Sequence, residues 1–250
     1  MDRVAQCIWP PLAEPFATAL RAAVRIIFTE VDPVGIVATG TIVRGGGHAN
    51  SDLDIYVVHL APFRRRVQQF CEGVPTEIFI NPPSAIRAYF IDEDRDGRRL
   101  TAHMLATGVV VYHSDPVVDE LRAEARDWLA RRAVISDAEW IHTRYAIASR
   151  LEDGLDVVGT DDVTATMLLS DAVTAMVEFA CRLHDGQIPR RKDLIAVLGA
   201  RAPELERLAT AFFRAATVAD RVENAVQLAD RVIGARGFFP WDSGPEPVSE

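Results

Sequence analysis

The spacing of apolar residues changes along the chain, and these changes predict which segments are helices and which are strands. Between positions 11 and 31, apolar side chains recur every three or four residues, as they do on one face of an α-helix. They are Phe16, Leu20, Val24 and Ile27. The next segment, 34–39, is a short unbroken apolar run with β-branched residues, which is typical of a buried strand. A helix followed by a buried strand is therefore expected at the start of the fold.

Three more strands are predicted before position 116. One begins at about Asp52, after the loop that the glycines at 45–47 indicate, and the others cover 76–81 and 109–112. Two short helices are expected between Pro83 and Gly108. Arg64, Arg65 and Arg66 are interpreted as a solvated turn after the second strand, with a polyanion site as the alternative.

Beyond Pro116 every segment has helical spacing and none alternates with a period of two. Ser136 and Glu139 form a capping box that starts one helix, and Asp161 or Thr160 caps the next. The sequence thus predicts an α/β (α+β) fold, with a short mixed sheet in residues 1–115 followed by an all-helical C-terminal bundle in residues 116–250.

Charge and composition narrow the classes of partner and compartment. The formal net charge is −9, so nucleic acid is not the expected partner and cations are attracted to the surface. The unbroken apolar stretches are much shorter than the roughly 20 residues that cross a bilayer, and no signal peptide is evident, so we expect a cytoplasmic protein without membrane contact. Cys7, Cys71 and Cys181 follow no metal-ligand spacing and are expected to be reduced thiols.

The residues most indicative of chemistry are three carboxylates. Asp52 and Asp54 are two positions apart in a predicted strand, so both side chains leave the same face. Glu77 comes on the next predicted strand and can lie beside them. Such a cluster of anions needs cations, and hard oxygen ligands favour Mg²⁺ or Mn²⁺. Asp52, Asp54 and Glu77 are therefore the predicted catalytic residues and the ligands of two Mg²⁺ ions, with Mn²⁺ possible.

A turn after the first strand supplies a second element of the predicted site. Gly40 permits a tight turn, and Thr41 then offers a hydroxyl and backbone N–H groups to a phosphate. Arg44 can add a cationic clamp, and Ser51 is assigned to the same nucleotide-binding group. Together these parts are suited to a nucleoside triphosphate and its metals.

One segment resembles the glycine-serine and Asp-x-Asp signature of the polymerase-beta-like nucleotidyltransferases. It consists of Gly40-Thr41, ten intervening residues and Asp52-Leu53-Asp54, with Thr41 in place of the serine. The resemblance implies that the aspartates bind the metals and that Glu77 completes the site. Glu77 within Thr-Glu-Ile-Phe-Ile-Asn-Pro, followed by a helical half, is similar to the small-molecule branch with the aminoglycoside and lincosamide nucleotidyltransferases. In aminoglycoside-type enzymes a C-terminal lysine often reaches the nucleotide phosphates, a role that falls here to Lys192, although a solvated cluster at a helix start also explains residues 189–192.

The expected reaction is transfer of a nucleoside monophosphate from an NTP, expected to be ATP, to an acceptor hydroxyl, with release of pyrophosphate. The expected acceptor is a small molecule such as an aminoglycoside-like antibiotic, which suits the acidic chain and implies a role in antibiotic resistance. Alternatives are a protein or tRNA target in a toxin-antitoxin-type system, or a non-catalytic nucleotide-binding module. The site could form within one chain or between two subunits, so a monomer or a homodimer is expected.

Overall fold

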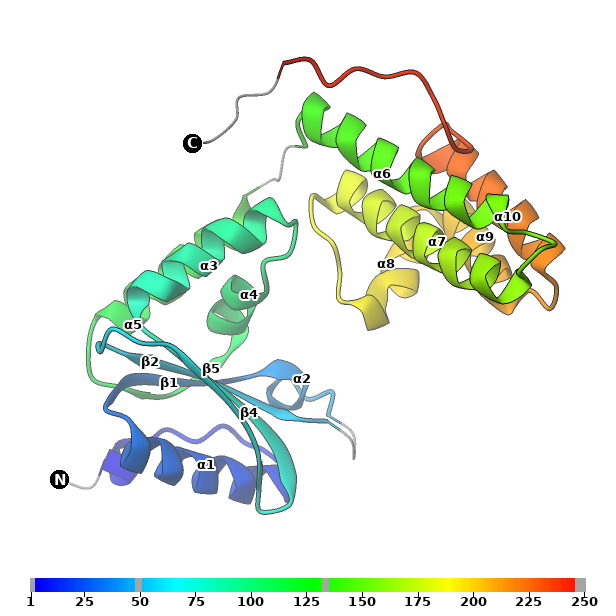
Figure 1. Ribbon diagram of the computed structural model, residues 1–250. Coiled ribbons are helices and arrows are strands. Elements are labelled where there is room, and N and C mark those ends of the chain that lie inside the picture. Colours follow the sequence, from blue (N-terminus) through cyan, green and yellow to red (C-terminus); the bar gives the residue numbers. More distant parts are fainter. Residues whose placement is uncertain (1–2, 48–50, 132–134, 246–250) are drawn as a thin grey trace. The chain divides into compact units, whose positions relative to one another are not determined.

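The first half of the chain contains both strands and helices, and helices alone follow in the described part of the second half (Figure 1). The structure, a computed structural model, describes residues 3–47, 51–131 and 135–245. The chain divides into an N-terminal unit, Met1–Arg131, and a C-terminal unit, Arg132–Glu250. This combination of a mixed sheet with a helical C-terminal region confirms the predicted fold class.

The N-terminal unit contains five strands and six α- or 3₁₀-helices among its described residues. The strands are β1 (Pro33–Thr39), β2 (Leu53–His59), β3 (Arg65–Cys71), β4 (Val74–Asn81) and β5 (Val109–His113). The helices are η1 (Arg3–Gln6), α1 (Phe16–Glu30), α2 (Gly40–Val43), α3 (Pro83–Arg95), α4 (Leu100–Thr107) and α5 (Val117–Ala130).

The strands form one mixed sheet in the order β3-β4-β2-β1-β5. β2 and β4 run parallel, and the remaining neighbours are antiparallel. The parallel pairing is important for the site because it aligns Asp54 directly with Glu77. The four strands predicted from sequence are all present, and β3 is an addition.

The interpretation of Arg64, Arg65 and Arg66 as a turn was wrong for most of this segment, because Arg65 begins β3. β3 is an edge strand that pairs only with β4. Its outward residues are exposed, while Cys71 is buried on the face toward α1. An edge strand needs little apolar surface, which explains why its charged start looks like a loop.

Helices cover both faces of the sheet (Figure 1). The side of α1 that carries Leu20, Val24 and Ile27 packs on one face, against Ile55, Ile78 and other strand residues. On the opposite face, α3, α4 and α5 pack around Tyr56, Phe90 and Leu105. Since alternate residues of a strand point to opposite faces, β1, β2, β4 and β5 contribute to both cores, whereas β3 contributes only to the core on the α1 face.

The boundary between the units lies later than the sequence analysis placed it. α5, which was assigned to the region after position 116, packs against α3 and α4 and buries Leu121 among them. The N-terminal unit therefore extends to Arg131 instead of ending at position 115.

The C-terminal unit is a bundle of helices around a core that includes Leu151, Leu169, Met176 and Phe212. Its helices are α6 (Asp137–Asp156), α7 (Asp162–Asp185), η2 (Arg191–Asp193), α8 (Leu194–Arg201), α9 (Pro203–Arg214) and α10 (Val218–Val232). Ser136 accepts a hydrogen bond from the backbone N–H of Glu139, as the capping box predicts. Asp161 caps α7 by accepting from the N–H groups of Val163 and Thr164.

α7 is long and apolar enough, by length and composition alone, to cross a membrane. The sequence analysis did not anticipate this, because it considered only unbroken apolar runs. In the bundle α7 buries nine residues, including Leu169, Val173 and Met176, which is the behaviour of a core helix. All three cysteines are free thiols, as expected.

Candidate active site

The carboxylates of Asp52, Asp54 and Glu77 meet on one face of the sheet. Asp54 lies opposite Glu77 in the parallel β2–β4 pair, and Asp52 precedes β2 by one residue. One ligand oxygen from each of the three residues can be chosen so that all lie within 4.8 Å of one another. The structure therefore brings together the three residues that were predicted to be catalytic.

The surroundings of Asp54 make its negative charge unfavourable. Burial, followed by the nearby charges of Asp52 and Glu77, raises the pKa of Asp54 from 3.8 to about 6, although Arg44 and Arg66 oppose the shift. A cation among the three carboxylates would relieve both causes, because it neutralises the repulsion and replaces the lost hydration. The electrostatics thus favour cation binding at this cluster.

Glu77 is held in place by two side chains from β3. Arg66 Nε donates a hydrogen bond to Oε1 of Glu77 over 2.6 Å, and Gln68 Nε2 donates to the same oxygen over 2.7 Å. Both bonds end on Oε1, which leaves Oε2 available to a ligand. Glu77 is only 9% exposed, so these donors also compensate for its lost hydration.

The predicted turn after β1 is present. Gly40 has φ +85°, and a β-carbon added there would lie 2.2 Å from Oδ2 of Asp54. Only glycine combines that backbone angle with that close approach. From Gly40 the chain enters the single turn α2, which includes Thr41, and Arg44 follows it.

The remaining residues predicted to bind nucleotide have different surroundings. Arg44 is exposed but close enough to lower the pKa of Asp54, and Ser51 is buried next to Asp52. Lys192 is exposed in η2 of the C-terminal unit, so its contact with nucleotide stays a prediction. His48, which follows the glycines of the predicted loop, lies outside the described residues.

Sequence analysis missed Arg66 and Gln68, which now form part of the site. The sequence marks only the turn of this hairpin, Glu72-Gly73, which is a two-residue connection from β3 to β4. Glu72 and Gly73 both have positive φ, at 47° and 79°. Residues 65–71 do not alternate between apolar and polar side chains, so the strand itself has no such signal.

An open groove of about 340 Å³ adjoins the carboxylates. Asp52 and Glu77 line it together with Gln68, Phe70 and Pro75. Phe70 is 77% exposed, although it is a large apolar residue. The cluster is therefore accessible to a ligand from the β3–β4 edge of the sheet.

The three carboxylates fit a divalent cation by their chemistry and their geometry. All donors are hard oxygens, their atoms are close enough to share an ion, and the pKa of Asp54 is raised first by burial and then by the charges of Asp52 and Glu77. Asp52, Asp54 and Glu77 are the residues that would hold Mg²⁺. Identity and number of the ions stay predictions.

Comparison with known proteins supports the fold. No family model and no curated protein sequence matches the chain. Solved structures do match it, among them a nucleotidyltransferase-like protein from Exiguobacterium sibiricum 255-15, with 11% identity and a TM-score of 0.54. That match covers 86% of this chain and 74% of the other. The protein therefore has a nucleotidyltransferase-like fold, and at this identity the likeness concerns the fold alone.

Proposed function

We propose that the protein is a metal-dependent nucleotidyltransferase that moves a nucleoside monophosphate from an NTP, preferentially ATP, to a hydroxyl group of a small-molecule acceptor. The observation that carries the proposal is the cluster of Asp52, Asp54 and Glu77 within 4.8 Å in a nucleotidyltransferase-like fold. Clustered carboxylates on adjacent strands suit in-line displacement at phosphorus.

In the proposed reaction, the acceptor oxygen bonds to the α-phosphorus of the NTP. The bond from that phosphorus to the oxygen bridging to the β-phosphate breaks, and pyrophosphate leaves with the electron pair. The proton of the acceptor hydroxyl passes to Glu77, whose Oε2 is not occupied by Arg66 or Gln68. Divalent cations held by Asp52 and Asp54 would neutralise charge on the attacking and leaving oxygens.

The turn at Gly40 and Thr41, with Arg44, is the proposed contact for the triphosphate. Gly40 brings the chain against Asp54, so a phosphate bound at the turn lies beside the carboxylates. Arg44 adds positive charge on that side of the cluster. Ser51 and Lys192 are proposed as further nucleotide contacts.

A label-transfer assay tests the proposal. Purified protein is incubated with Mg²⁺ and each α-labelled NTP, and small hydroxyl compounds, tRNA and cell lysate serve as separate acceptors. We expect label on a small molecule, release of pyrophosphate, and loss of both in Asp54→Asn. Asp92→Asn, which changes an exposed carboxylate on α3, is the matched control and should keep full activity.

Each other outcome revises a specific part of the proposal. Label on protein or RNA contradicts the small-molecule acceptor, and normal turnover by a folded Asp54→Asn variant contradicts the assignment of the carboxylates. Absence of both transfer and Mg²⁺-dependent NTP binding contradicts the nucleotidyltransferase function itself.

A further inference from the structure

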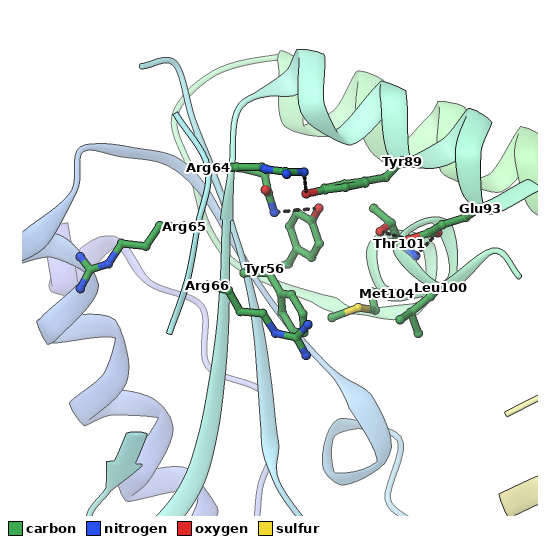
Figure 2. Close-up of a pocket in the computed structure, with 11 residues that line it drawn as sticks. Tyr56, Arg64, Arg65, Arg66, Tyr89, Glu93, Leu100, Thr101 and Met104 are labelled. Carbon is green, nitrogen blue, oxygen red and sulfur yellow. Dashed lines mark hydrogen bonds between the residues drawn. The ribbon is translucent and has the colours of Figure 1, made fainter. Parts of the chain in front are cut away.

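A pocket of about 460 Å³ lies on the same face of the sheet as the three carboxylates, within the N-terminal unit (Figure 2). Tyr56 is two residues after Asp54 on β2, and Phe79 is two residues after Glu77 on β4. Side chains two apart in a strand leave the same face, so the pocket continues the carboxylate cluster along the strands. A volume of this size is typical of small-molecule sites.

Arg66 connects the pocket with the carboxylates. Its guanidinium lies over the ring of Phe79, 4.8 Å from the centroid, and its Nε is bonded to Glu77. A molecule seated in the pocket therefore lies next to the residue proposed to accept the proton.

Aromatic side chains form much of the pocket wall. The rings of Tyr56 and Phe79 are stacked with their planes 10° apart. Tyr89 of α3 stands across from Tyr56 (Figure 2). Asn81 donates a hydrogen bond to Oη of Tyr56, which fixes that ring. Tyr56 is only 1% exposed and supports Phe79 from behind, so the half-buried rings of Phe79 and Tyr89 offer the aromatic surface, which favours a flat ring in the ligand.

Arg64 provides a positive charge at the edge of the pocket. Its guanidinium donates a hydrogen bond of 2.8 Å to the hydroxyl of Tyr89, a neutral group (Figure 2). No carboxylate among the described residues pairs with it. The carboxylate of Glu93 on the opposite wall already accepts bonds from the backbone N–H and the hydroxyl of Thr101. The charge of Arg64 is thus available to an anion.

Arg65, the neighbour of Arg64, is also among the residues at the pocket, but its charge is neutralised by a carboxylate of α1. Its side chain points away from the pocket in Figure 2 and pairs with Glu30 of α1 over 2.7 Å. The same substitution at Arg64 and at Arg65 therefore separates the effect of an unpaired charge at the pocket from that of a paired one.

The pocket and the predicted phosphate turn adjoin the carboxylates at different places. The turn follows β1 and lies against Asp54, while the pocket continues along β2 and β4 from Asp54 and Glu77 and is completed by Arg64, α3 and α4. In-line displacement at phosphorus needs an attacking group and a leaving pyrophosphate at different positions around the phosphorus. The separation of pocket and turn leaves room for an acceptor and a triphosphate at the same carboxylates.

We propose that this pocket binds the acceptor, and that the acceptor is a small hydroxyl compound with a flat ring and an anionic group bound by Arg64. This inference rests on the proposed transferase function and identifies its substrate class. It replaces the expectation of an aminoglycoside-like polycation, which came from the net charge of the whole chain and from the family resemblance, whereas the pocket has its own local charge.

Three matched phenols test the inference by ligand-observed NMR titration without nucleotide: phloretate is an anion, tyrosol is neutral and tyramine is a cation. Kanamycin serves as the polycation. We expect wild-type protein to bind phloretate about tenfold more tightly than tyramine, and Arg64→Gln to lose this preference. Arg64→Lys, which keeps the charge, should retain most of the preference, and Arg65→Gln should behave as wild type.

The inference is overturned if phloretate does not bind wild-type protein, if tyramine or kanamycin binds as tightly as phloretate, or if Arg65→Gln loses as much as Arg64→Gln. Circular dichroism of each variant establishes that it is folded. Since this titration needs no turnover, its result is independent of the label-transfer assay. Phloretate binding without nucleotide transfer and without Mg²⁺-dependent NTP binding would refute the proposed function, whereas transfer to cationic acceptors without anion preference would refute the inference alone.

Discussion

Gly40 lies directly against the carboxylate of Asp54, so close that a β-carbon at Gly40 would stand 2.2 Å from Oδ2. The turn that is expected to hold phosphate and the residue that is expected to hold metal are therefore in van der Waals contact. A side chain on one must displace the other.

Gly40→Ala should consequently damage both stability and activity. The positive φ alone costs about 1–2 kcal/mol for a residue with a β-carbon, and the clash with Asp54 adds about 1–3 kcal/mol. We expect a lower midpoint in thermal unfolding and a turnover reduced by at least about tenfold, since the carboxylate moves.

Gly73→Ala is the matched control for this variant. Gly73 has nearly the same backbone angle, φ +79°, but nothing lies within 4 Å of an added β-carbon. It should show only the backbone cost and keep its activity. Equal losses in both variants would contradict a specific contact between Gly40 and Asp54.

Asp54→Asn should stabilise the metal-free protein at about pH 7 while abolishing turnover. The folded protein raises the pKa of Asp54 from 3.8 to about 6, so ionisation of this group costs stability as the pH rises between these values. The full shift corresponds to about 3 kcal/mol, and partial solvent exposure reduces the expected gain to about 1–2 kcal/mol.

Urea unfolding of wild type and variant at two pH values checks this prediction. The stabilisation should be present at about pH 7 and absent at about pH 4, where Asp54 is protonated in the folded protein. Mg²⁺ should raise the unfolding temperature of wild type but not of Asp54→Asn. A variant that is destabilised at neutral pH would contradict the cost assigned to the buried charge.

Arg66→Met should lower stability by about 1 kcal/mol and strengthen Mg²⁺ binding. Glu77 loses its cationic partner in this variant, whereas methionine still covers Phe79. The cluster then carries one more uncompensated negative charge, which attracts a divalent cation. The measurement is the Mg²⁺-induced shift in unfolding temperature, which should exceed that of wild type.

Arg65→Met provides the comparison for Arg66→Met, because its ion pair with Glu30 lies on the other face. Its Mg²⁺ response should equal that of wild type. A smaller Mg²⁺ shift in Arg66→Met than in Arg65→Met would mean that Arg66 supports the metal site instead of competing with the ion.

Lys192→Gln tests the predicted contact between the C-terminal unit and the triphosphate. If Lys192 binds phosphate, the variant should raise KM for the NTP by roughly tenfold, or about 1.4 kcal/mol, with little change in kcat. Arg191→Gln, next to it in η2, is the control. Unchanged KM in Lys192→Gln would remove this residue from the nucleotide site.

Much of the N-terminal fold follows from sequence because its strands are buried and apolar. Val34–Thr39 and the residues after Asp52 are almost continuously apolar. This is the pattern of a strand that lies in the middle of a sheet and is buried on both faces. The two aspartates are identifiable for the same reason, since charges directly adjoining an apolar strand are unfavourable unless they serve a site.

β3 and α5 were harder to assign because their place in the fold depends on contacts with other elements and not on their own residue pattern. β3 is an edge strand that starts with two arginines, and it is held by pairing with β4. α5 has helical spacing, but the spacing does not say which unit it packs against. The pocket beside Glu77 could not be predicted from the sequence either, because it depends on the strand register that brings Tyr56 next to Phe79.

Because β3 lies at the sheet edge, the residues around the proposed acceptor include ones on a different strand from the carboxylates that are proposed to react. Asp54 and Glu77 lie on inner strands, where a substitution disturbs neighbours on both sides. Arg66, Gln68 and Phe70 point to the same face but are exposed and have only one neighbouring strand. If the protein acts as proposed, substitution of Phe70 can therefore alter the surroundings of the acceptor without moving Asp54 or Glu77, whereas substitution of Arg66 or Gln68 also removes a hydrogen bond from Glu77.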